Sequence, residues 1–66
     1  MRVKEQAYNL VVYLLGSGAV SKGSTLGQLR LDLFHAVKQV FGKNALTDID
    51  LVTTVNKALS DTGVIL

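Results

Sequence analysis

The chain has 66 residues, of which 48% are hydrophobic and 18% are charged, and its formal net charge is +2. This length allows one domain. The high hydrophobic and low charged fractions are the opposite of those of a disordered segment. The small basic excess is far from the clustered Lys and Arg of a nucleic-acid-binding surface. The absence of cysteine and the single histidine exclude disulfides, thiolate metal sites and a zinc site made by histidines alone.

A helix is predicted over about residues 2–15. In a helical projection its apolar side chains share one broad arc: Val3, Ala7, Tyr8, Leu10, Val11, Leu14 and Leu15. The run Leu10–Leu15 also suits a buried strand because it contains β-branched and aromatic residues, but a helix is favoured since the amphipathic pattern already begins at Val3. Gly16 suits the left-handed C-terminal cap of this helix.

The apolar run Leu10–Leu15 is too short to span a membrane, which takes about 20 apolar residues. The polar residues before it also interrupt the pattern of a secretory signal peptide: Glu5, Gln6 and Asn9. We therefore expect no membrane span and a cytoplasmic protein.

A glycine-rich segment follows, from Gly16 to Ser24. The letters LVVYLL followed by GSGAVS resemble the strand and phosphate loop that open a dinucleotide-binding unit. However, Ser21 stands where the third glycine belongs, and no second strand follows. Gly18 and Gly23 have the glycine spacing of a P-loop, but Ser24 follows Gly23 where a P-loop has its lysine. The segment is therefore predicted to be a connection between helices.

The second predicted helix covers about residues 25–41. Ser24 or Thr25 can cap its start, and Thr25 and Gln28 have the spacing of a capping box. Gly42 is predicted to end it. The apolar residues recur at spacings of three and four: Leu26, Leu29, Leu33, Ala36 and Val40, widened by Phe34, Val37 and Phe41.

The third predicted helix covers about residues 48–61. Thr47 is a good N-cap, and Asp48 and Asp50 fall in the first turn, where the helix dipole favours negative charge. Gly63 is predicted to stop the helix before an apolar tail. The apolar side comprises Ile49, Leu51, Val52, Val55, Ala58 and Leu59.

The short turn between the second and third helices also permits a helix-turn-helix, in which residues 48–61 would read DNA. Asp48 and Asp50 would then face the phosphate backbone, which they repel. The basic residues are scattered over the loops and both helices: Lys22, Arg30, Lys38, Lys43 and Lys57. DNA binding is therefore the disfavoured alternative.

No residue pattern indicates catalysis. His35 lies on the polar side of the second helix with Asp32 three residues before it, and a general acid or base needs a reacting group within reach. An exposed histidine beside a carboxylate explains this pair. We predict that the protein is not an enzyme and takes neither a cofactor nor a metal.

Two polar residues break the apolar pattern. Arg30 falls between the directions of Val37 and Phe41, and Asn56 falls inside the apolar arc of the third helix. Arg30 can lay its stem on apolar surface and keep its head in water, and Asn56 can be a satisfied amide at the core edge. The alternative is that both set specificity at a protein interface, as buried polar residues do in coiled coils.

These features predict a single all-α domain over residues 1–66, a small three-helix bundle. The apolar arcs cover about half of each helix, which is wider than the roughly 100° stripe that a surface helix buries. Another chain should cover the surplus, in a homo-oligomer, most simply a two-fold dimer, or on a larger protein partner. The expected function is a non-enzymatic interaction module: an adaptor, inhibitor or assembly factor. The candidate partner-binding residues are Val12, Tyr13, Arg30, Leu31, Phe34, Phe41, Asn56 and Ile65.

Overall fold

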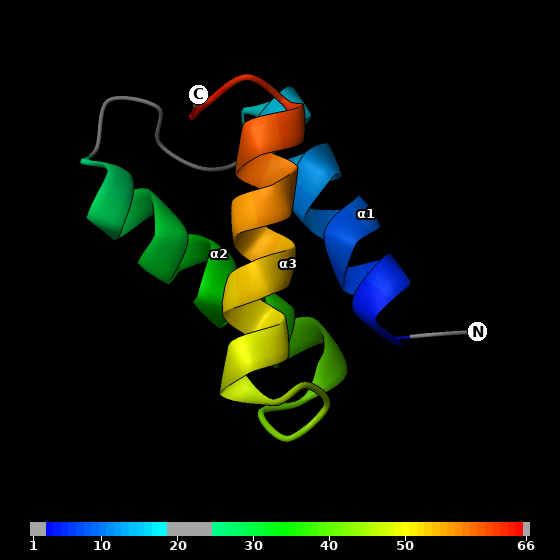
Figure 1. Ribbon diagram of the computed structural model, residues 1–66. Coiled ribbons are helices and arrows are strands. Elements are labelled where there is room, and N and C mark those ends of the chain that lie inside the picture. Colours follow the sequence, from blue (N-terminus) through cyan, green and yellow to red (C-terminus); the bar gives the residue numbers. More distant parts are fainter. Residues whose placement is uncertain (1–2, 19–24, 66) are drawn as a thin grey trace.

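The computed structural model describes residues 3–18 and 25–65, which form three helices and no strand (Figure 1). Each helix contacts the other two, so the predicted all-α three-helix bundle is confirmed. The predicted helical boundaries agree with the observed ones to within two residues. The helices are α1 (Val3–Ser17), α2 (Leu26–Phe41) and α3 (Asp48–Asp61).

The run Leu10–Leu15 is helical throughout, and the prediction that α1 ends at Gly16 is wrong. The helix continues through Gly16 to Ser17, and the residue with a left-handed backbone is Gly18, at φ 75°. The Ser17 hydroxyl donates to the carbonyl of Leu14 at 3.3 Å and so satisfies an acceptor in the last turn. Either glycine could adopt a positive φ, and the chain uses the second.

The starts of α2 and α3 follow the predicted capping chemistry. Thr25 and Thr47 both have extended backbones, and their hydroxyls accept hydrogen bonds from the backbone N–H groups of Gln28 (3.2 Å) and Asp50 (3.1 Å). The capping box at Thr25 is only half made, because the Gln28 amide donates to Asp32 at 3.0 Å. Ser24, the alternative cap, lies outside the described residues.

The ends of α2 and α3 use the two glycines expected there. Gly42 has φ 98°, and its N–H donates to the carbonyl of Lys38. Gly63 has φ 80° and follows the last residue of α3 by two positions. Its N–H donates to Ser60 at 3.1 Å, and the N–H of Val64 donates to Leu59 at 2.9 Å. These two bonds form a Schellman motif, which satisfies carbonyls that the helix leaves open.

The core consists of aliphatic side chains supplied by all three helices. Burying each leucine or valine side chain fully contributes about 1.5–3 kcal/mol. Larger residues, among them Tyr8, Phe34 and Phe41, pack around its margin. The buried apolar residues are Ala7, Val11, Leu15, Leu29, Leu33, Val37, Leu51, Val55, Ala58 and Leu59.

The helices are arranged so that α1 and α3 lie side by side and run in the same direction, while α2 crosses behind α3 (Figure 1). The C-terminal ends of α1 and α3 lie together at the top of that view. None of the described helices is long and apolar enough to cross a membrane. The side-by-side pair α1 and α3 forms the groove described below.

Candidate functional site

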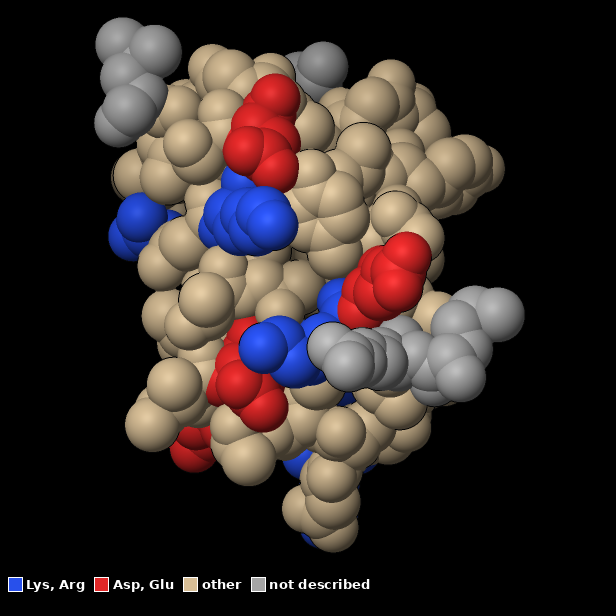
Figure 2. All heavy atoms as spheres, turned by 45° about the vertical axis from the view of Figure 1, so that its right-hand side comes forward, with Lys and Arg blue, Asp and Glu red and all other residues tan. Residues whose placement is uncertain are grey.

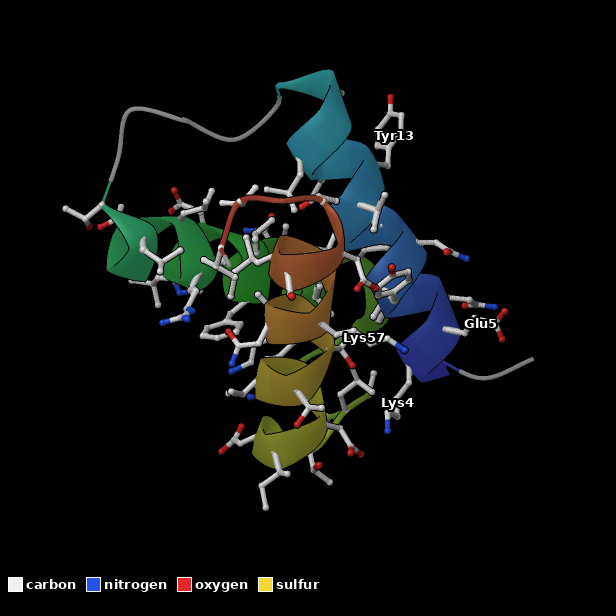
Figure 3. The ribbon with its side chains drawn as sticks, turned by 45° about the horizontal axis from the view of Figure 1, so that its top comes forward. Lys4, Glu5, Tyr13 and Lys57 are labelled. Carbon is white, nitrogen blue, oxygen red and sulfur yellow. The ribbon has the colours of Figure 1, made fainter. Side chains whose placement is uncertain are left out.

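The apolar residues predicted to bind a partner fall into two groups. Tyr13 and Leu31 are exposed, at 68% and 45% of their surface, and Tyr13 points outward from the upper half of α1 (Figure 3). The other apolar residues pack against the core and form its margin: Val12, Phe34, Phe41 and Ile65. The structure therefore brings no single apolar surface together from all of these residues.

The two polar residues that break the apolar pattern are both half-buried, and each holds an unsatisfied atom. Nε of Arg30 and Oδ1 of Asn56 are closed off from solvent and have no hydrogen-bond partner among the described residues. An unpaired buried polar atom of this kind costs about 1–3 kcal/mol. Arg30 therefore keeps its Nε away from water, and the amide of Asn56 is not fully satisfied among the described residues.

Four residues that the sequence pattern placed on the apolar sides of α2 and α3 are exposed instead: Leu26, Val40, Ile49 and Val52. Ile49 is the most exposed of them, at 78%. Ile49, Val52 and Asn56 succeed one another along α3 at spacings of three and four, so they lie on one face of the helix. We call these three residues the α3 stripe. The sequence predicts Ile49 and Val52 on the apolar side of this helix, but it does not predict which part of that side stays exposed.

A second feature, which the sequence pattern did not predict, is a groove of about 350 Å³ between α1 and α3. We call it the α1–α3 groove. Its lining is mostly carbon, with two ammonium groups, one carboxylate and several hydroxyls at its edges. The lining residues are Lys4, Glu5, Tyr8, Thr53, Thr54 and Lys57.

Three polar contacts hold α1 and α3 together around this groove. The Tyr8 hydroxyl donates to Oδ2 of Asp61 at 2.6 Å, and this hydrogen bond, with a smaller effect of burial, raises the pKa of Tyr8 above its usual value of 10.0. The Lys57 ammonium lies 5.7 Å from the centre of the Tyr8 ring, in cation–π range. Lys4 pairs with Asp50 at 3.6 Å on the exposed rim.

Lys57 reaches from α3 toward α1, whereas Glu5 points away from α3 (Figure 3). Basic and acidic side chains alternate on the face that contains α1, with no large area of one sign (Figure 2). This face therefore does not have the continuous basic surface that tracks a nucleic-acid backbone.

His35 is exposed on α2, and Asp32, its acidic neighbour, accepts the hydrogen bond from Gln28. Within residues 3–18 and 25–65, no three His, Cys, Asp or Glu side chains are grouped so that they could hold a metal ion. Comparison of the chain with protein-family models, curated proteins and solved structures found no significant match.

Proposed function

We propose that this chain is a small non-enzymatic interaction module that associates with a second copy of itself through the α3 stripe. The observation that carries the proposal is the composition of this stripe. Exposed Ile49 and Val52 stand directly beside Asn56, whose carbonyl oxygen has no partner among the residues that the structure describes.

The spacing of the stripe favours another helix as the occupant of this surface. Residues 49, 52 and 56 repeat at three and four, which is the spacing of the seam between two paired helices. A β-branched residue at the first position and a single asparagine at the third are typical of two-stranded seams, where the asparagine sets register and oligomeric state. This pattern supports pairing of α3 with the α3 of a second copy.

The chemistry of Asn56 favours a symmetric contact. A primary amide carries both donors and an acceptor, so it can pair with the same residue of a second copy across a two-fold axis. Oδ1 is turned inward in the single chain, but rotation about the Cβ–Cγ bond has a broad energy profile. Such a rotation would turn Oδ1 to the exposed side and supply the partner that it lacks.

The size of the protein gives such a contact an energetic role. A domain near 60 residues buries only about 60% of its unfolded surface, and this chain has no cysteine from which to make disulfides. Burying Ile49 and Val52 in a dimer would add up to about 1.5–3 kcal/mol for each side chain. Folding and association should therefore be coupled.

The direct test is sedimentation of the purified chain over a range of concentrations. We expect a monomer–dimer equilibrium that Val52→Lys shifts to monomer, because the substitution places a charge in the apolar seam. The matched control is Leu31→Lys on α2, since Leu31 and Val52 are equally apolar and are exposed to nearly the same extent, 45% and 43%. A monomer at every concentration would overturn the proposal. So would dissociation by the control variant alone.

Asn56→Leu provides a second test of the same contact. Replacing a seam asparagine with an apolar residue is expected to strengthen association but to lose the unique dimeric state, as in coiled coils. Sedimentation should then show tighter complexes with larger species among them. An unchanged dimer would show that Asn56 lies outside the contact.

DNA binding through α2 and α3 is the alternative that this proposal must exclude. Asp48 and Asp50 occupy the first turn of α3, where a recognition helix would meet phosphates. We expect no binding of random duplex DNA at low salt. Binding that falls steeply with added salt would favour the DNA-binding regulator.

A further inference from the structure

We infer that the α1–α3 groove binds a small organic carboxylate with an apolar body, held by the Lys57 ammonium and the Thr54 hydroxyl. The groove shares no residue with the α3 stripe, so this inference is independent of self-association. It depends on a hydroxyl without a partner among the described residues, a cation without a counter-charge, and the apolar lining of the groove.

Thr54 supplies the first of these observations. Only 5% of its surface is exposed, yet its hydroxyl makes no hydrogen bond within residues 3–18 and 25–65. The hydroxyl oxygen is not among the atoms closed off from solvent, and Thr54 is one of the residues that line the groove. A carboxylate bound in the groove could accept a hydrogen bond from this hydroxyl, which has no partner in the described part of the chain.

Lys57 supplies the second observation. Its ammonium lies over the Tyr8 ring, and no carboxylate in the described part of the chain lies within 4.0 Å of it. The other lysine of the groove, Lys4, already pairs with Asp50, and Glu5 points away from α3 (Figure 3). One positive charge therefore faces the groove without a counter-charge.

The rest of the lining sets the size and polarity of the ligand. The Tyr8 ring, the threonine methyl groups and the lysine stems make a mostly carbon surface. The volume of about 350 Å³ lies near the lower limit of small-molecule pockets. A single cation without a counter-charge matches a monoanion. These properties together indicate a monocarboxylate with a short apolar body.

The test is an NMR titration of the isotopically labelled chain with hexanoate and with N-acetylphenylalanine, which represent a free carboxylate and a peptide C-terminus. We expect shifts at the amides of Thr53, Thr54 and Lys57, with dissociation constants of about 1 mM. Whichever probe binds more tightly identifies the source of the carboxylate, and either result supports the inference. Benzyl alcohol, which lacks the charge, should bind at least about tenfold more weakly.

Lys57→Met is the main variant because it keeps the stem and removes the charge. It should weaken hexanoate binding by about tenfold or more, while Lys38→Met, an exposed lysine on α2, should leave binding unchanged. Thr54→Val removes the hydroxyl with little change of shape, and its circular dichroism shows whether the bundle is intact.

Three results would overturn the inference. The first is equal binding of hexanoate by Lys57→Met and the parent chain. The second is equal amide shifts with hexanoate and with chloride. The third is amide shifts that lie outside the groove. Val52→Lys should retain hexanoate binding, so failure of the dimer would not be mistaken for failure of the groove.

Discussion

The hydrogen bond between Tyr8 and Asp61 has a consequence for stability at high pH. It raises the pKa of Tyr8 in the folded chain above 10.0. Because the folded pKa is the higher one, the contact stabilises the fold fully below the unfolded pKa and is lost as pH rises through the folded pKa. We therefore expect the stability of the bundle to fall above about pH 10 through this residue.

Absorbance titration of the phenolate checks this in a Tyr13→Phe background, since Tyr8 is then the one remaining tyrosine. The pKa of Tyr8 should lie above 10.0, and Asp61→Ala should lower it toward that value. An identical titration with and without Asp61 would show that the hydrogen bond is not formed in solution.

Single residues also show what the sequence could and could not reveal. Arg30 and Asn56 stand out from a helical projection alone, because a polar residue within an apolar arc is visible in one helix. The roles of Tyr8 and Lys57 are not visible in that way. Their contacts join α1 to α3, and the periodicity of one helix carries no information about which side chains a second helix brings near.

At the scale of the helices, the sequence predicted where α2 and α3 begin more accurately than which of their apolar side chains are exposed. Thr25 and Thr47 cap α2 and α3 as expected, because a cap depends on neighbouring residues only. The end of α1 differs from the prediction at Gly16 because Gly18 offers the same backbone freedom two residues later. The exposure of Ile49 and Val52 within the apolar side of α3 is not predicted, because a projection gives the direction of a side chain but not where the neighbouring helix ends.

The cap of α3 gives a prediction at this scale. Thr47→Ala removes the acceptor for the N–H of Asp50 and should destabilise the fold by about 1 kcal/mol. This corresponds to a fall in Tm of roughly 4–8 °C for a domain of this size, measured by thermal denaturation. Thr47→Ser keeps the acceptor and is the control. If both variants have the same Tm as the parent chain, the cap contributes nothing to stability.

For the whole molecule, the core is so small that each central side chain contributes a large part of the free energy of unfolding. Leu33 is fully buried among residues of all three helices. Leu33→Ala should cost about 2–5 kcal/mol, which approaches the total of about 3–5 kcal/mol that a core of this size supplies. We expect this variant to be largely unfolded in urea titrations followed by circular dichroism.

Leu31→Ala is the matched control for Leu33→Ala, because Leu31 is exposed on the same helix. It should change stability by no more than about 0.5 kcal/mol. Equal losses from the two variants would contradict the observed orientation of α2. If the chain associates as proposed, the urea midpoint of the parent should also rise with protein concentration.

The contact between Tyr8 and Asp61 also bears on the order in which the bundle assembles. It joins residues 53 positions apart, and the entropy cost of closing a loop grows with the length of chain enclosed. The turn between α2 and α3 encloses far less chain, so those two helices should meet first. The contact between α1 and α3 should then form late, and the environment of the Tyr8 phenol reports when it forms.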